Sequence, residues 1–347
     1  MYVELKHVVK LYDTYRAADD INLSIEEGRL VALLGPSGSG KTTILRMIAG
    51  LERQDSGDIL IDGRLVNDVP GNERGIGFVF QNYALFRYMT VFDNIAFGLE
   101  VQKREKQFIR QRVEELLALT NLEGLAKRYP NQLSGGQRQR VAFARAIAPQ
   151  PRLLLLDEPF AAIDAKVRKD LRLWLRQTIT RLGVTSIFVT HDQEEAIEVA
   201  DDIVITNNGR IEQVGSPMEI CTDPQTSFVA EFIGSGAAVY HMTHFCGFEE
   251  SPMEYAIVQP EFVHVFSRGE AADVPQELLQ TGVVEKVSFR GTNYELELIA
   301  CGEKLTAFRS MEVPAVKAGD TVKLYISRAK GMKGEKTRLL RNEKLKP

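Results

Sequence analysis

The sequence has few cysteines, and this scarcity limits the ways in which the chain can be held together. Its three cysteines, Cys221, Cys246 and Cys301, are odd in number, widely spaced and form no C-x-x-C pair. A disulfide framework or a structural zinc site needs cysteines in pairs with regular spacing. We therefore expect three free, reduced thiols.

Long hydrophobic runs and a surplus of basic residues are also missing. No apolar run approaches the ~18 residues needed to span a bilayer, and the opening MYVELKHVVK lacks the apolar core of a signal peptide. Lys and Arg total 43 against 47 Asp and Glu, a formal net charge of -4, whereas nucleic-acid binders usually show a strong basic excess. We expect a cytoplasmic protein that does not bind nucleic acid.

What is present is an ordinary globular composition in a chain of 347 residues, enough for two domains. The first two-thirds alternate helical stretches with short apolar runs: LVALLG, GIGFVF, RLLLLDE and TSIFVT. Runs this dense are typical of strands buried on both faces of a parallel sheet. The pattern predicts an α/β domain over residues 1–234.

Between GIGFVF and RLLLLDE the sequence has few strand signals. The segment REKQFIRQRVEELLALT has helical spacing at Phe108, Val113, Leu116 and Leu117. We expect a mostly helical subdomain over about residues 82–150, inserted into the α/β domain.

The pattern changes near GSGAAV, after which several short strand-like runs follow in about 110 residues. In NYELELIA, Tyr294, Leu296 and Leu298 alternate with Glu295 and Glu297, as in a half-buried strand. These runs predict a small all-β, OB-like domain over residues 235–347. The closing stretch KGMKGEKTRLLRNEKLKP has mixed charge with a basic excess, and we expect a solvated, partly disordered tail.

The segment GPSGSGKT, Gly35–Thr42, fits the phosphate-binding loop pattern G-x-x-x-x-G-K-[ST]. It follows the strand-like RLVALL and precedes the helix-like TTILRMIAG, which is the context that the pattern requires. Its glycines expose backbone N–H groups to phosphates, Lys41 can reach the β- and γ-phosphates, and the Thr42 hydroxyl can bind Mg²⁺. The predicted nucleotide-binding residues here are Gly35, Pro36, Ser37, Gly38, Ser39, Gly40, Lys41, Thr42 and Thr43.

Polar residues follow the other strand-like runs. Asp157 ends RLLLLD and is suited to the magnesium shell, and Glu158 directly after it could take a proton from attacking water. Gln81 follows GIGFVF, and His191 follows TSIFVT. Ligand-binding groups gather at the carboxyl ends of parallel strands, so we expect these side chains to meet Lys41 there.

A second candidate phosphate cradle lies downstream, in LSGGQRQRVAFARA, Leu133–Ala146. Ser134 is suited to cap a helix, because its side-chain oxygen can accept from a free backbone N–H of the first turn. Gly135 and Gly136 leave the backbone open to an anion.

LSGGQ between a phosphate loop and LLLLDEP resembles the signature of ATP-binding cassette (ABC) ATPases, and all the family's motifs occur in order across about the first 235 residues. In that family two cassettes pack head to tail, and the signature of one caps the ATP held by the other. The resemblance implies a homodimer with two ATP sites, two transmembrane permease subunits and, indirectly, an extracytoplasmic solute-binding protein. The chain would lie at the cytoplasmic face of the inner or plasma membrane.

The resemblance also assigns roles to single residues. Tyr12, with Tyr15 as the nearby alternative, would stack on adenine, and Gln81 would touch Mg²⁺ and the attacking water. His191 would contact the γ-phosphate as a switch. The residues that would meet the partner's nucleotide are Ser134, Gly135, Gly136 and Gln137. The loop after the catalytic carboxylate includes Asp164, which is also predicted to belong to the nucleotide site. That loop reads AAID here, with Ala161 in place of the family's usual serine and Ile163 in place of leucine.

Two further stretches bear on the transported solute and its sensing. GFVFQNYALFRYMTVFDNIAFGL, Gly77–Leu99, resembles the matching segment of sulfate/thiosulfate importer ATPases and should face the membrane subunits. Its aromatic residues Tyr83, Phe86 and Tyr88 could equally belong to the local core. The β-rich end resembles the barrel appended to importer ATPases, with Gln259 where the family has an arginine.

Other functions stay open at this point. Iron(III), polyamine or sugar importers share much of the Gly77–Leu99 segment. A soluble ABC ATPase acting on DNA needs a long coiled coil between the motifs, and one acting on the ribosome needs two cassettes, and neither is present here. A third alternative is a module whose β-rich end senses a small anion.

Overall fold

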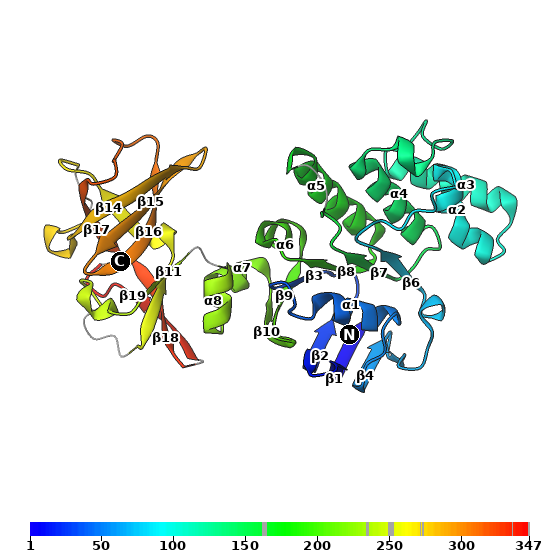
Figure 1. Ribbon diagram of the computed structural model, residues 1–347, viewed down its shortest axis with the longest axis horizontal. Coiled ribbons are helices and arrows are strands. Elements are labelled where there is room, and N and C mark those ends of the chain that lie inside the picture. The colour runs from blue at the N-terminus through cyan, green and yellow to red at the C-terminus, as the bar shows by residue number, and fades with distance from the viewer. Residues whose placement is uncertain are drawn as a thin grey trace. The chain divides into compact units, whose positions relative to one another are not determined.

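The computed structural model describes residues 1–161, 165–233, 236–248, 253–270, 272, 274–334 and 336–345. The chain divides into two compact units, Met1–Met218 and Glu219–Pro347 (Figure 1). The division falls earlier than the predicted boundary between residues 234 and 235, because helix α8 (Ser227–Ile233) packs Ala230 against Ile257 and Met332 of the second unit. Where the folded domain itself ends remains a prediction.

The centre of the first unit is a six-stranded sheet with the order β10-β9-β3-β8-β7-β6 (Figure 1). Its strands are β3 (Leu30–Leu34), β6 (Ile76–Val79), β7 (Leu153–Asp157), β8 (Thr185–Thr190), β9 (Asp202–Asn207) and β10 (Arg210–Gly215). All pairs are parallel except β9 with β10. The four apolar runs of the sequence form β3, β6, β7 and β8, and every residue of β3, β7 and β8 is buried. The predicted α/β fold is confirmed.

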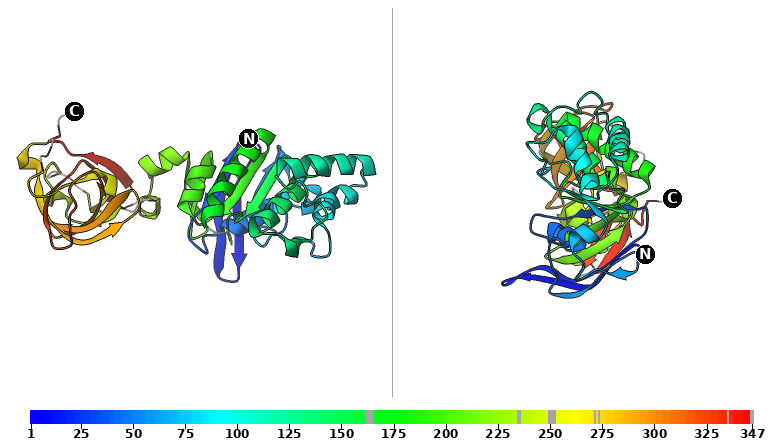
Figure 2. Two further views of the ribbon diagram at one scale, coloured as in Figure 1. Left: turned by 90° about the horizontal axis from the view of Figure 1, so that it is seen from above. Right: turned by 90° about the vertical axis from the view of Figure 1, so that its right-hand side faces the viewer.

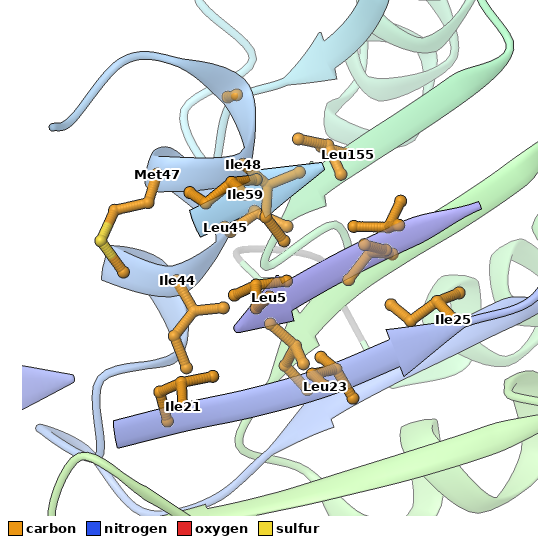
Figure 3. Packing of buried hydrophobic residues seen from close by; sticks show 14 of the residues in the cluster. Leu5, Ile21, Leu23, Ile25, Ile44, Leu45, Met47, Ile48, Ile59 and Leu155 are labelled. Carbon is orange, nitrogen blue, oxygen red and sulfur yellow. The ribbon is translucent and has the colours of Figure 1, made fainter. Parts of the chain in front are cut away.

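A second, antiparallel sheet was not expected from the sequence. Its order is β2-β1-β4-β5, from β1 (Val3–Tyr12), β2 (Tyr15–Ile25), β4 (Ser56–Ile61) and β5 (Arg64–Leu65). Helix α1 (Lys41–Ala49) fills the space between the two sheets, with Ile44, Leu45 and Ile48 packed on Leu5 of β1 and Leu155 of β7 (Figure 3). This core holds the loop that precedes α1, because the loop joins two buried elements, β3 and α1.

The predicted helical subdomain lies between β6 and β7. It contains α2 (Val91–Val101), α3 (Lys106–Leu119), the short 3-10 helix η2 (Pro130–Gln132) and α4 (Gly135–Ile147). The helix predicted here is confirmed as α3, whose buried residues are Ile109, Val113, Leu116 and Leu117, whereas Phe108 is 41% exposed. Arg104 stacks on the Phe108 ring instead, and this contact shelters a ring that the helix turns toward solvent.

Helices α5 (Ala165–Leu182) and α6 (Gln193–Val199) complete the first unit and connect β7, β8 and β9. The short helix α7 (Pro217–Thr222) then leads into the second unit. No helix of the described residues combines the length and the apolar character that crossing a bilayer demands.

The second unit is built from two antiparallel sheets. One has the order β11-β12-β18-β19, and the other β13-β17-β14-β15-β16. The strands are β11 (Ala237–Val239), β12 (Tyr255–Val258), β13 (Val263–Phe266), β14 (Gln280–Phe289), β15 (Asn293–Ala300), β16 (Glu303–Ser310), β17 (Thr321–Ile326), β18 (Arg328–Lys333) and β19 (Lys336–Arg341). The two end strands of the second sheet, β13 and β16, contact each other, so the sheet curls into a nearly closed barrel (Figure 2). The predicted all-β, OB-like architecture is confirmed.

Two local predictions for this unit had opposite outcomes. NYELELIA forms β15 with Leu296 and Leu298 buried and Glu297 exposed, as predicted. The closing stretch is not a solvated tail over its whole length: β18 and β19 pair as antiparallel strands, and Met332 and Leu340 are buried. These two residues hold the hairpin against the core of the unit, whereas Leu339 beside them is 40% exposed. All three cysteines are described; they lie in this unit as free thiols, with Cys301 exposed.

Candidate functional site

The phosphate loop needs glycine at its turns because neighbouring backbone leaves no room for a side chain. Gly38 and Gly40 have φ of 81° and 95°, a left-handed conformation that favours glycine. A Cβ on Gly40 would stand 1.9 Å from the Ala17 carbonyl oxygen, and one on Gly35 would stand 2.2 Å from that of Thr206. Gly40 is also the N-cap of α1, so the loop presents its backbone N–H groups at a helix N-terminus, where anions bind.

The Lys41 ammonium group lies within the curve of this loop. Its Nζ donates to the carbonyl oxygens of Gly35 and Pro36 at 2.8 and 2.7 Å and to Ser39 Oγ at 3.2 Å. Burial lowers the pKa of Lys41, and the nearby Glu158 carboxylate opposes that shift. A buried cation at the centre of exposed N–H groups makes the loop an anion site.

A cleft of about 300 Å³ opens over the loop. Its lining residues come from the β1–β2 hairpin, the phosphate loop, α1 and the ends of β7 and β8: Tyr15, Ser37, Gly38, Gly40, Lys41, Thr42, Thr43, Glu158 and His191. Tyr15 donates its hydroxyl to the Gly38 carbonyl. Tyr12, the predicted adenine contact, is not among the described residues that line the cleft, and its ring lies beside Lys10, 5.2 Å from Nζ. Which tyrosine stacks on a base remains a prediction.

Asp157 and Thr42 lie side by side at the floor of the site. The Thr42 hydroxyl donates to Asp157 Oδ1 at 3.2 Å, and Arg46 lies 3.9 Å from Oδ2. Burial raises the pKa of Asp157, and the Thr42 hydrogen bond and Arg46 partly offset that rise. A hydroxyl and a carboxylate are oxygen ligands of the kind that Mg²⁺ prefers.

Glu158 connects two other predicted residues. Gln81 Nε2 donates to Glu158 Oε2 at 2.7 Å, and His191 Nδ1 lies 3.7 Å from Oε1. Each of the three follows a strand, and those strands, β6, β7 and β8, are neighbours in the sheet. As the sequence predicted, the structure brings together at the carboxyl ends of the parallel strands the residues Lys41, Thr42, Asp157, Glu158, Gln81 and His191. Their individual roles remain predictions.

The LSGGQ segment lies elsewhere in the unit. Ser134 caps α4: its Oγ accepts from the Gln137 N–H at 3.3 Å, and Gln137 Oε1 accepts from the Ser134 N–H at 2.9 Å. The capping role predicted for Ser134 is confirmed. Ser134, Gly135, Gly136 and Gln137 do not line the cleft over the phosphate loop, so within one chain the two cradles are separate. Asp164 and Ile163, the remaining predicted positions, lie outside the described residues.

The sequence did not reveal two residues that support the site. Thr206, in β9, bonds through Oγ1 to Ser39 Oγ at 2.9 Å and so ties the phosphate loop to the sheet. Arg145, near the end of α4, donates to the carbonyl oxygens of Tyr83 and Ala84. Thr206 could have been found as a polar residue near the end of a buried strand, whereas no local signal distinguishes Arg145 from the other arginines of its helix.

Known proteins resemble this chain over its length. The ABC transporter family model matches residues 18–161. The sulfate/thiosulfate import ATP-binding protein CysA 2 of Agrobacterium fabrum is 48% identical over 339 residues, which cover 95% of this chain and 98% of the relative. The sulfate/thiosulfate import ATP-binding protein CysA of Synechococcus elongatus is 54% identical over 265 residues, 76% of this chain and 77% of the relative.

A solved structure agrees with the first unit. The ATP-binding cassette MJ0796, a dimer in a post-hydrolysis state bound to ADP and Pi, aligns with a TM-score of 0.56 and 36% identity over 62% of this chain and 98% of that one. Identity near one half over nearly the whole length, together with a phosphate loop, an acidic strand end and a capped LSGGQ helix in one fold, leads to a single assignment. The chain belongs to the family of ABC transporter ATP-binding proteins.

Proposed function

We propose that this chain is the ATP-hydrolysing subunit of an ABC importer for sulfate or thiosulfate. The observation that carries the proposal is the 48% identity over 95% of the chain to an import ATP-binding protein named for these two anions. The segment Gly77–Leu99, which resembles the same group, supports it. An importer for iron(III), a polyamine or a sugar is the alternative within the family.

The residues of the cleft fit Mg-ATP. Backbone N–H groups of Gly38 and Gly40 and the Lys41 ammonium would hold the β- and γ-phosphates. Thr42 and, through water, Asp157 would hold Mg²⁺, and Gln81 would contact the ion. The ion supplies charge neutralisation between the β- and γ-phosphates when it is bound.

Hydrolysis needs a base beside the γ-phosphate, and Glu158 is placed for that role. Its carboxylate lines the cleft and is oriented by the Gln81 amide at 2.7 Å. Glu158 would take the proton of the attacking water, while Lys41 and His191 stabilise the transferring phosphoryl group. In this scheme the rate gain comes from positioning and electrostatics.

A homodimer would complete each site. The γ-phosphate held by the partner's phosphate loop would be contacted by Ser134, Gly136 and Gln137. The LSGGQ segment would therefore bind the partner's nucleotide rather than the chain's own. MJ0796, a relative of the first unit, has been solved as a dimer. Ala161 replaces the usual serine at the following loop, so a hydrogen bond from that position across the dimer would be missing.

The permease subunits would dock on the helical subdomain at the cytoplasmic face of the membrane. Tyr88 is 97% exposed and lines a groove of about 740 Å³ with Arg87, Tyr129 and Arg138. Such a large exposed ring beside arginines is typical of an interaction surface. Tyr83, by contrast, is buried and Phe86 is 37% exposed, so Tyr88 is the most exposed of the three aromatic residues and the first candidate for docking. The solute-binding protein would act through the permease.

The experiment that tests the proposal is radiolabelled sulfate uptake in cells that lack this subunit and regain it together with its own membrane partners. We expect uptake to fall on deletion and to return with the native chain but not with K41A. Unchanged uptake on deletion would move the solute to iron, a polyamine or a sugar. ATP hydrolysis without any coupled uptake would favour a soluble ABC ATPase.

A further inference from the structure

The loop that carries Gln81 contains two consecutive residues in a backbone conformation that they disfavour. Tyr83 and Ala84 have φ of 64° and 44°, in the left-handed region that residues other than glycine rarely adopt. Such a conformation persists only where the surroundings hold it, and it occurs preferentially at functional sites. The contacts around these two residues therefore indicate what fixes the loop.

One holding contact comes from α4. Arg145 Nη1 donates to the Ala84 carbonyl at 2.7 Å, and Nη2 donates to the Tyr83 carbonyl at 2.8 Å. Its guanidinium carbon lies 5.3 Å from the centre of the Phe86 ring. The planar fork of arginine matches two adjacent acceptors in a way that a lysine ammonium cannot. No carboxylate among the residues that the structure describes forms an ion pair with Arg145, so these carbonyls are the groups that satisfy it.

A second holding contact comes from α2. Asn94 is fully buried; its Oδ1 accepts from the Phe86 N–H at 2.9 Å, and its Nδ2 donates to the Phe86 carbonyl at 3.1 Å. Arg145 and Asn94 thus attach the segment from Tyr83 to Phe86 to two helices of the helical subdomain.

The other end of the loop reaches the catalytic turn. The Gln81 amide bonds Glu158 Oε2, and the Tyr83 hydroxyl donates to the Ala161 carbonyl at 3.4 Å. Glu158 itself has a φ of 45°. A shift of the Tyr83–Ala84 turn would therefore move the group that orients the Glu158 carboxylate.

We propose that Arg145 is a positioning residue that sets the Gln81 amide against Glu158 by holding the Tyr83–Ala84 turn. Because α4 begins at the Ser134 cap and runs without a break to Ile147, the same contact links the LSGGQ end of the helix to the base. A nucleotide engaged at that end would then adjust the base through a rigid helix and two hydrogen bonds. This inference rests on the proposed function, since it assumes that Glu158 is the base.

The test is a double-mutant cycle on the purified full-length chain, with ATP hydrolysis followed by phosphate release. We expect R145M, which keeps the apolar stem and loses both donors, to lower kcat about 10-fold and to leave KM for ATP within about 2-fold. In the Q81A background the same substitution should change kcat by less than about 2-fold, because Arg145 then has no amide left to position. R140M is the matched control: Arg140 lies on α4 and donates to the Thr120 carbonyl, away from the loop, and should leave kcat within about 2-fold.

Two more conservative variants, R145K and R145K combined with A84G, test the same contact if R145M does not fold. R145K keeps the charge and can serve only one carbonyl at a time, so kcat should fall by about 3-fold. Adding A84G should restore most of that loss, because glycine adopts the left-handed conformation without help.

An equal loss from R145M in the native and Q81A backgrounds would overturn the inference, as would a rise in KM that accounts for the loss. Failure of A84G to restore R145K would also count against it. If the native chain releases no phosphate at all, the proposed function fails and the inference fails with it. Hydrolysis by the native chain with additive variants removes only the inference.

Discussion

At the scale of single residues, Asp157 combines a cost in stability with a role in the site. Its carboxylate is buried beside Thr42, and burial raises its pKa. A carboxyl with a raised pKa binds its proton more tightly in the folded state, so the folded chain loses stability as pH rises through that pKa. Above that pKa the ionised, buried carboxylate lowers the stability of the folded chain, a cost that the proposed magnesium site would require.

We expect D157N to melt higher than the native chain at pH 7–8, in buffer without nucleotide or magnesium. The rise should be about 2–4 °C, which is the shift that about 1 kcal/mol produces in a domain of this size. It should shrink toward zero as pH falls to about 4, where an ordinary Asp also becomes protonated. Thermal unfolding at several pH values measures this, with D68N as the control because Asp68 is exposed. A lower melting point at pH 8 would contradict the prediction.

Glu158 supports a prediction about chemistry at the same scale. E158Q should bind ATP as tightly as the native chain, since in the proposed site the phosphates would be held by the loop and Lys41. It should hydrolyse ATP at least about 100-fold more slowly, the usual effect of removing a general base. Nucleotide binding by fluorescence and phosphate release measure the two quantities separately. Turnover at the native rate would show that another group is the base.

At the scale of elements, two helices of the helical subdomain start with the same device. Ser134 and Gln137 form a capping box on α4, and Thr90 and Asp93 form one on α2. Only the α4 cap belongs to a motif with a proposed nucleotide role. A comparison of the two capping boxes therefore separates the contribution of a cap to helix stability from a role in nucleotide binding.

S134A and T90A should each lower the free energy of unfolding by about 1 kcal/mol. Only S134A should also lower the ATPase rate. Urea unfolding can be followed by the fluorescence of Trp174, the single tryptophan of the chain, whose ring contacts Phe143 of α4 edge-on at 5.2 Å. An S134A rate equal to that of T90A would remove Ser134 from the nucleotide site.

The elements that could be predicted are those whose burial can be inferred from a few consecutive residues of the sequence. The runs that form β3, β7 and β8 are dominated by apolar residues, so the burial of both faces could be predicted from each strand alone. The β18–β19 hairpin was missed because its core contacts come from isolated residues such as Met332 and Leu340 among charges. Hydrophobic spacing predicted helix α3 but could not show that Ile109 faces inward and Phe108 outward, because spacing alone does not say which side of a helix is buried.

The site followed the same logic. The residues that follow the strands were correctly predicted to lie close to one another, because the carboxyl ends of neighbouring parallel strands lie on the same side of the sheet. The contacts of Arg145 on Tyr83 and Ala84 could not be predicted, because they depend on how a loop turns and where a distant helix ends. The choice between Tyr12 and Tyr15 likewise depends on the turn of the β1–β2 hairpin.

At the scale of the whole molecule, the place where the first unit ends is open to direct test. Helix α8 is mostly apolar, and its buried residue Ala230 packs against Ile257 and Met332 of the second unit. A chain ending at residue 234 would carry this helix without the surface that covers it. A chain ending at Met218 would not.

We expect the fragment 1–218 to run as a single species in size-exclusion chromatography and to bind ATP. The fragment 1–234 should aggregate, or bind a dye for apolar surface, because α8 exposes its apolar stripe. Light scattering at equal concentration compares the two. Clean behaviour of 1–234 together with aggregation of 1–218 would restore the boundary predicted from the sequence.

The distribution of cysteines has a practical consequence. Every thiol of the chain lies beyond Met218, and Cys301 is exposed in the turn between β15 and β16. A thiol-specific maleimide or spin label added to the native chain therefore reacts first at Cys301 in the second unit, because the thiols of Cys221 and Cys246 are only partly accessible. A thiol-specific reagent that slows ATP turnover would act through the second unit, so a titration with such a reagent would measure how strongly the second unit influences the first.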